Sequence, residues 1–297
     1  MNLKDLFPAF EAAYQAMTSI YEPVFVEYSS RFNLTPQDLS LLTVVPTFEP
    51  TPVSVALLNI SSPYTAPELY QFQLDNLTDV GMLNRVGENE YRMSQQGLDV
   101  LKTTLNAINS TLGGIQSLPV TKMMDLASRL KELADTCLTA PDPPGTWCIQ
   151  HKRRQDPGSG SPMMVRIDQF LAELRAFRDD AHLASWHGIE SDGHAWDILT
   201  YLWIEKESSF ESICRALKRR GNLPERTQQA VDMLAQKGWL TKEDSILRIT
   251  PTGSEIRRTA EATTDRFYLE PFRRFSEIEL EKTLELIEEH RRGLSVR

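Results

Sequence analysis

Apolar residues recur every three or four positions along most of this chain, a spacing that predicts amphipathic helices. Residues 3–33 begin the pattern, and Pro23 is expected to kink or divide that helix because proline lacks a backbone donor. Short alternating segments within residues 82–93 and 239–249 predict two β-hairpins. The expected fold is mainly α with small β-hairpin wings. Further helices are predicted at residues 36–46, 52–60, 66–80, 94–112, 119–138, 165–186, 194–203, 209–219, 224–237 and 276–294.

An internal repeat underlies this pattern. Residues 41–83 and 198–240 align without a gap at an offset of 157, and each copy continues through a hairpin into a small polar residue followed three positions later by glycine. The repeated order is a helix, a turn, a helix that ends in glycine, and a hairpin, which predicts tandem winged helix-turn-helix modules. The identical positions, numbered in the first copy, are Leu42, Thr43, Pro67, Glu68, Gln71, Asp75, Leu77, Gly81 and Leu83.

Length and turn residues predict where the modules divide. A chain of 297 residues suggests about two domains. Prolines and glycines are concentrated in residues 139–164, which predicts a loop or linker there, although Trp147-Cys148-Ile149 is apolar enough to pack on a module. We therefore expect an N-terminal module at residues 1–138 and a C-terminal module at residues 165–297, each with flanking helices.

The charge distribution separates the two copies. The net charge of −9 argues against a simple nucleic-acid coat protein, because phosphate neutralisation dominates non-specific binding. Residues 1–118 contain five basic and twelve acidic residues, whereas residues 165–297 contain twenty-one basic and twenty-four acidic residues. The basic residues of the second copy cluster before its last helix and along its hairpin. The matching hairpin of the first copy has only Arg85 and Arg92.

The remaining composition is that of an ordinary globular protein, with 41% hydrophobic residues. No apolar stretch is long enough for a transmembrane helix, and the first residues lack the pattern of a secretory signal. Cys137, Cys148 and Cys214 are far apart and show no Cys-x-x-Cys spacing, so we expect reduced thiols. These features favour a cytoplasmic protein without membrane association.

Two segments carry a resemblance to a known family. VDMLAQKGWLTKEDSILRITPTG and LDNLTDVGMLNRVGENEYRMSQQG resemble the DNA-binding domain of MarR-type winged-helix regulators. The resemblance covers about 80 residues in each half and implies a recognition helix, a wing and a turn into a dimerisation helix. Both wings lack the family's Asp-x-Arg motif, and two units share one chain. Either the usual two-fold dimer is mimicked within a monomer, or the first copy has lost DNA contact.

The resemblance implies a DNA-binding transcriptional regulator, with double-stranded DNA bound mainly by the C-terminal module. Side chains at the start of a recognition helix read bases in the major groove, and preceding and wing cations grip phosphate. The first copy, with Glu68 and Tyr70 at the start of the equivalent helix, is expected to meet protein rather than DNA. The alternative is an adaptor that uses winged helices for protein assembly. The candidate DNA-binding residues are Lys218, Arg219, Arg220, Arg226, Thr227, Gln228, Gln229, Lys242 and Arg248.

Other chemistry has little support in the sequence. His182, His187 and His194 stand among acidic residues, but without a metal-ligand spacing, so we expect a surface run and no bound metal. No catalytic or cofactor motif is present, so neither an enzyme nor a cofactor is expected. The aromatic residues of segment 186–203 are expected in the core, although they could line a pocket for a small-molecule effector. The amphipathic segment 276–294 is expected to pack on another subunit, as in a homodimer, or on the N-terminal helix.

Overall fold

The computed structural model describes residues 3–190, 192–243 and 245–295, and over this range the fold is mainly α with two small sheets. The strands are β1 (Leu83–Gly87), β2 (Glu90–Met93), β3 (Glu207–Ser209), β4 (Leu240–Glu243) and β5 (Ile246–Ile249). The helices are α1 (Leu6–Arg31), α2 (Pro36–Val44), α3 (Val55–Ser61), α4 (Pro67–Asp79), α5 (Gln95–Gly113), α6 (Val120–Leu138), α7 (Trp147–Arg153), α8 (Met163–Trp186), α9 (Gly193–Glu205), α10 (Phe210–Ala216), α11 (Pro224–Gln236), α12 (Pro251–Leu269) and α13 (Glu277–Ser295). The predicted fold class is confirmed.

Two units have the same order of elements. The first unit comprises α2, α3, α4 and the hairpin β1–β2, and the second comprises α9, α10, α11 and the hairpin β4–β5. In the second unit the short strand β3 pairs with β5, which gives a three-stranded antiparallel sheet in the order β3-β5-β4. In the first unit the equivalent pairing is reduced to one isolated bridge, between Val53 and Tyr91. Strand β3 was not predicted from the sequence.

Matching caps begin the long helix that follows each hairpin. The Ser94 hydroxyl accepts a hydrogen bond from the Gly97 amide at 2.9 Å, and the Thr250 hydroxyl accepts one from the Gly253 amide at 3.0 Å. These caps satisfy donors that a helix N-terminus leaves unpaired. A Cβ on either glycine would lie 2.2 Å from the carbonyl oxygen of the residue before the first wing strand. The repeated glycine is therefore required for close packing of the helix on the hairpin.

The helix before each hairpin ends in the same way. Gly81 has a φ of +78° and Gly238 a φ of +71°, the left-handed conformation that glycine adopts without a steric penalty. The hydroxyl of Ser94 donates to the Gly81 carbonyl at 2.6 Å, and that of Thr250 donates to the Gly238 carbonyl at 2.7 Å. The sequence repeat thus corresponds to a repeat of individual hydrogen bonds.

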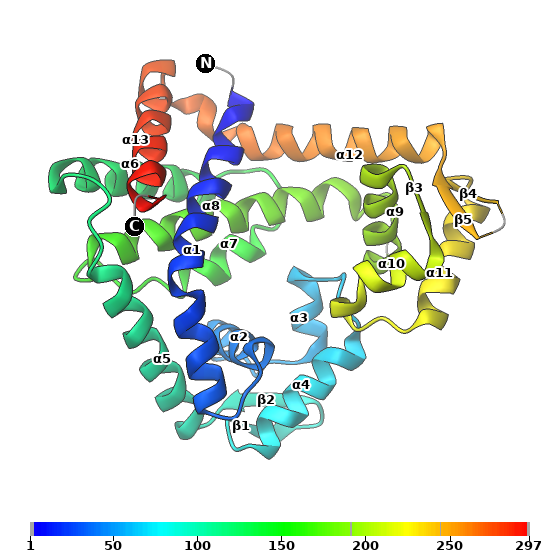
Figure 1. Cartoon of the computed structure of the whole chain (residues 1–297), viewed down its shortest axis with the longest axis horizontal. Coiled ribbons are helices and arrows are strands. Elements are labelled where there is room, and N and C mark those ends of the chain that lie inside the picture. Colours follow the sequence, from blue (N-terminus) through cyan, green and yellow to red (C-terminus); the bar gives the residue numbers. More distant parts are fainter. Residues whose placement is uncertain (1–2, 191, 244, 296–297) are drawn as a thin grey trace.

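A central hydrophobic core lies around α8, which crosses the middle of the molecule with the first unit below it and the second unit at one end (Figure 1). Helices α1, α6, α7 and α12 all pack on α8. Helix α1 is one continuous helix that includes Pro23, so of the two expectations for that proline, a kink or a division, the division is wrong. Helix α13 packs on α1, as the second of the two expectations for the C-terminal segment stated. The core therefore includes residues from both ends of the chain.

Segment 139–164 contains the seven-residue helix α7, which is fastened to α8 at both ends. The Asp180 carboxylate accepts hydrogen bonds from the backbone amides of Cys148 and Ile149, at 2.7 and 3.0 Å. Arg153 donates two hydrogen bonds to the carboxylate of Glu173, at 2.9 and 2.6 Å. Burial raises the pKa of Asp180 to about 6, although the two backbone hydrogen bonds act in the opposite direction. The prolines of this segment thus flank an ordered, docked helix.

No helix among the described residues has the length and apolar character needed to cross a membrane.

Candidate nucleic-acid interface

Helix α11 occupies the position where the sequence predicts a recognition helix, and one of its faces is exposed to solvent. Its buried positions follow a helical stripe of Thr227, Ala230, Val231 and Leu234. The opposite face is solvent-exposed and polar, and it consists of Glu225, Gln228, Gln229, Asp232 and Gln236. The structure therefore brings Gln228 and Gln229 to the surface where the sequence placed them, directly after the first turn of the helix.

Thr227 does not belong to this surface, and its assignment as a DNA-binding residue is corrected. Its residue exposure is 2%, and its hydroxyl donates to the Leu223 carbonyl at 3.3 Å. The same hydroxyl lies 3.0 Å from Nε2 of the buried His194, so it can accept a hydrogen bond from that nitrogen. Burial lowers the pKa of His194 to about 4, so the ring is neutral at physiological pH. The stripe shared with Val231 and Leu234 was the sequence signal for this buried position.

The two wing cations lie on opposite faces of the hairpin. Lys242 is opposite the buried Leu247 in the β4–β5 register, whereas Arg248 is the next residue along β5. Successive side chains of a strand point to opposite faces, so Lys242 and Arg248 do not share one. Lys242 pairs with Asp232 of α11, and Arg248 pairs with two other carboxylates of its own sheet.

The ion pairs of the wing shift the pKa values of the groups involved. The hydrogen bond from Lys242 lowers the pKa of Asp232, and the hydrogen bond to Glu207 raises the pKa of Arg248. The Arg248–Glu207 pair has a separation of 2.6 Å. Both pairs are exposed, and exposed pairs are weak enough to exchange partners with another anion.

The cations near the start of α11 differ in their surroundings. Lys218 and Arg219, in the 3-10 helix η3 (Lys218–Arg220), are exposed. Arg220 is half-buried, and its Nε donates to the Asp197 carboxylate at 3.0 Å. Arg226 lies 3.8 Å from the Asp192 carboxylate. Lys218 and Arg219 are therefore the most available cations of this region.

The first unit has an ion pair that matches the Lys242–Asp232 pair of the second unit, but its net charge is different. Arg85 pairs with Asp75 at the positions that Lys242 and Asp232 occupy in the second unit. Residues 36–93 contain two basic and seven acidic residues, whereas residues 193–249 contain nine basic and eight acidic residues. The first unit also exposes 67% of Phe72 on α4, in place of a polar residue. Its equivalent surface is therefore acidic and partly apolar.

The turns before α4 and α11 contact each other. The Ala66 amide donates to the Arg220 carbonyl at 2.8 Å, and the Asn222 side chain donates to the Tyr64 carbonyl at 3.1 Å. In a two-fold helix-turn-helix dimer the recognition helices enter major grooves about 34 Å apart. Helices that begin in contact cannot enter neighbouring grooves in that way. The expectation that one chain mimics the usual dimer is therefore wrong for this arrangement.

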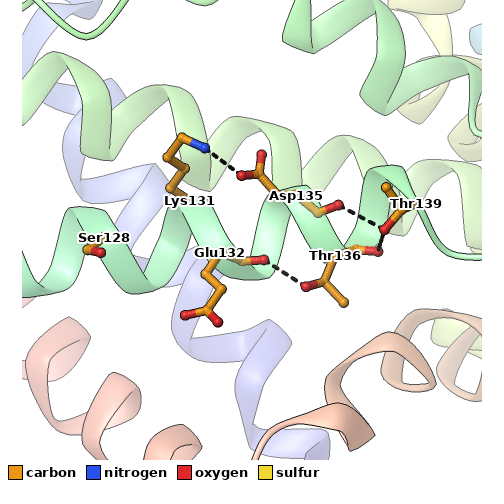
Figure 2. A pocket seen from close by; sticks show the side chains of 6 residues that line it. All are labelled: Ser128, Lys131, Glu132, Asp135, Thr136 and Thr139. Carbon is orange, nitrogen blue, oxygen red and sulfur yellow. Dashed lines mark hydrogen bonds and ion pairs between the residues drawn. The ribbon is translucent and has the colours of Figure 1, made fainter.

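The other candidate sites show fewer features of a binding site. The aromatic rings of Trp186 and Trp196 are buried and stacked, with centroids 5.3 Å apart, as expected for core residues. The described histidines, cysteines and carboxylates include no group of three or more that could hold a metal ion. A shallow depression of about 490 Å³ lies along α6, where Lys131 pairs with Asp135 and the threonine hydroxyls bond to carbonyls of the same helix (Figure 2). Its polar groups are largely satisfied within α6.

Comparison with protein families identifies the kind of domain that the chain contains. A model described as a helix-turn-helix family matches residues 90–295, which is more than half of the chain. The match begins at β2 and includes the whole second unit. No curated protein and no solved structure matches the chain. With its second unit entirely inside the matched region, the chain belongs to the helix-turn-helix family.

Proposed function

We propose that this protein is a transcriptional regulator of MarR-like winged-helix type that binds double-stranded DNA through its second unit. The observation that carries the proposal is the exposed polar face of α11, which directly follows the exposed cations Lys218 and Arg219. In this proposal the two units are modules of one ancestral kind, and residues 139–164 connect them. No catalytic role is assigned to either module.

Each candidate side chain has a distinct role in this proposal. Gln228 and Gln229 have the amide chemistry that pairs with adenine, and Arg226 has the fork that pairs with guanine. Lys218 and Arg219 contact phosphate and position the helix. The wing cations and Arg220 must exchange their carboxylate partners for phosphate, so they contribute less than unpaired cations would.

The decisive measurement is DNA affinity as a function of salt. Wild-type protein is titrated with genomic fragments, and the slope of log K against log salt is compared with that of a Lys218→Ala/Arg219→Ala variant. Each lost phosphate contact reduces the magnitude of the slope by about 0.9. Arg85→Ala, which removes a cation from the first unit, is the matched control and should leave the slope unchanged. Negligible binding by the wild type at low salt contradicts the proposal.

A base-reading role is tested separately. Gln228→Ala/Gln229→Ala should weaken binding to the preferred sequence by about 1–3 kcal/mol for each lost bidentate contact and leave non-specific binding intact. Equal losses of affinity on all DNA sequences would show that α11 does not read bases.

A second candidate, a protein-assembly adaptor without DNA binding, is favoured by the paired cations and by the acidic first unit with its exposed Phe72. An acidic surface with an exposed aromatic side chain suits a protein partner better than phosphate. Flat, negligible DNA binding in the salt titration, with the chain folded, is the result this candidate predicts.

A further inference from the structure

A cavity of about 390 Å³ lies between the two units. Ser62 and Tyr64, from the turn after α3, line one side of it, and Asp179 of α8, Asp197 of α9 and Arg220 of η3 line the other. Its volume falls near the lower end of the roughly 300–1,000 Å³ typical of small-molecule sites. The cavity is separate from the outer face of α11 and from the shallow depression on α6.

The turn that forms one wall is held firmly in place. The Trp186 indole donates to the Tyr64 hydroxyl at 3.2 Å, and the two rings lie 5.7 Å apart. The guanidinium of Arg220 lies 5.2 Å from the centroid of the Tyr64 ring. Gly193 approaches the Pro63 carbonyl so closely that an added Cβ would lie 2.4 Å from its oxygen. The cavity is therefore preformed, as binding sites for small molecules usually are.

Its charge is unbalanced. Asp197 is paired with Arg220 at 3.0 Å, but Asp179 forms no hydrogen bond or ion pair with any residue that the structure describes. Solvent reaches Asp179, yet the surrounding protein raises its pKa to about 6, which leaves the carboxylate mainly ionised at neutral pH. His182, which also lines the cavity, is kept neutral because burial lowers its pKa to about 4. The side chains that line the cavity thus include one cation and two carboxylates, and Arg175 and Arg178, outside the lining, also act electrostatically on Asp179.

Hydroxyl groups supply the remaining polar lining. The Thr200 hydroxyl donates to the Trp196 carbonyl at 2.7 Å, and the Ser61 hydroxyl donates to the Leu58 carbonyl at 3.2 Å. Each hydroxyl has used its donor and retains a lone pair, so it can accept a hydrogen bond from a ligand. The cavity therefore offers one unpaired carboxylate and several acceptors, which suits a ligand that is cationic and rich in donors.

We propose that this junction cavity binds a small organic cation that carries an amine and several hydroxyl groups, with the amine on the Asp179 carboxylate. This inference does not depend on DNA binding. The ligand contacts both units, so binding stabilises their mutual arrangement and raises the unfolding temperature by mass action.

The test uses glucosamine as the probe, with glucose as the hydroxyl-only control and cyclohexylamine as the amine-only control. Calorimetric titration and thermal unfolding are measured on the full chain. Glucosamine should bind at millimolar concentration or below and more tightly than either control. A charge-assisted hydrogen bond contributes about 1.5–3 kcal/mol, so Asp179→Asn should weaken glucosamine binding by about tenfold or more.

Two further variants keep the result interpretable. Thr200→Val removes an acceptor from the cavity wall and should weaken binding less than Asp179→Asn does. Glu132→Gln removes one carboxylate from the depression on α6 and should leave binding unchanged (Figure 2). Unchanged affinity in a folded Asp179→Asn variant, or no binding of either amine by the wild type, would overturn the proposal. None of these readouts involves DNA, so their failure is distinct from failure of the regulator proposal.

Discussion

The two units share their backbone devices and differ in the side chains placed around them. At matching positions, each has a hydroxyl side chain that caps the helix after the hairpin, a glycine in the left-handed conformation, and a second glycine that packs closely against the hairpin. Beside the second unit, the guanidinium of the buried Arg257 of α12 lies 4.7 Å from the Trp196 ring centroid and 5.2 Å from that of Trp203. The repeat places Leu101 and Leu39 at the positions of Arg257 and Trp196 in the first unit. The fold thus fixes the turns and caps, while the packing around them has diverged.

The largest expected effect is a loss of stability on substitution of the glycine that packs against the hairpin in both units. Gly97→Ala and Gly253→Ala each place a Cβ against a backbone carbonyl that cannot move without disturbing the hairpin. Overpacking of this kind destabilises by about 1–3 kcal/mol or more, and we expect the upper end for both variants. Urea unfolding measures the loss of free energy.

Gly160→Ala is the control for these variants, because an added Cβ there meets no atom within 4 Å. A large loss of stability from one glycine substitution and none from the other would show that the helix does not pack on the hairpin in the same way in the two units.

The next largest expected effect is a difference between the two units in how their stability depends on pH. The folded-state pKa of His194 is lowered to about 4 by burial, against a usual value of 6.5. Between these values the unfolded chain binds a proton that the folded chain does not, so stability falls as pH falls. A pKa difference corresponds to about 1.4 kcal/mol per unit, so the contribution lost over the whole interval is on the order of 3 kcal/mol. Burial raises the pKa of Asp197 and opposes part of this loss.

Residues 36–93 contain no histidine, so between pH 7 and pH 5 the protection of backbone amides from hydrogen exchange, measured relative to their intrinsic rate at each pH, should fall more in the second unit than in the first. His194→Gln, which matches Gln37 of the first copy, should reduce the difference. Titration of the His194 ring near its usual pKa by NMR would contradict this prediction.

The smallest effect concerns a hydrogen bond that only the first unit has. The Tyr91 hydroxyl donates to the Asp75 carboxylate at 2.7 Å, whereas the matching residue in the second unit is Leu247. Tyr91→Phe should destabilise the protein by about 1 kcal/mol, measured by urea unfolding. The pKa of Asp75, which hydrogen bonds from Gln71 and Tyr91 lower, should rise towards its usual value in this variant. An unchanged pKa of Asp75 in this variant would show that Gln71 and Arg85 are sufficient to keep that pKa low.

The helices and hairpins were predictable because their apolar spacing is local. Strand β3 was not, because Glu207–Ser209 is three residues long and is defined by its pairing with β5. Thr227 was misassigned because its place near the start of α11 outweighed its membership of the buried stripe. The contact between Tyr64 and Asn222 joins residues 158 positions apart, and no local pattern signals such a pair. The cavity beside it was equally invisible in the sequence.

The position of α8 has a consequence for how the chain is synthesised. Helix α1 is synthesised before α8 and α13, which cover part of its apolar face. Part of the apolar face of α1 therefore stays uncovered in a nascent chain until α8 and α13 have been synthesised, although α5 packs on α1 earlier. Stalled or truncated products will expose that surface, and they are the species we expect to depend on chaperones.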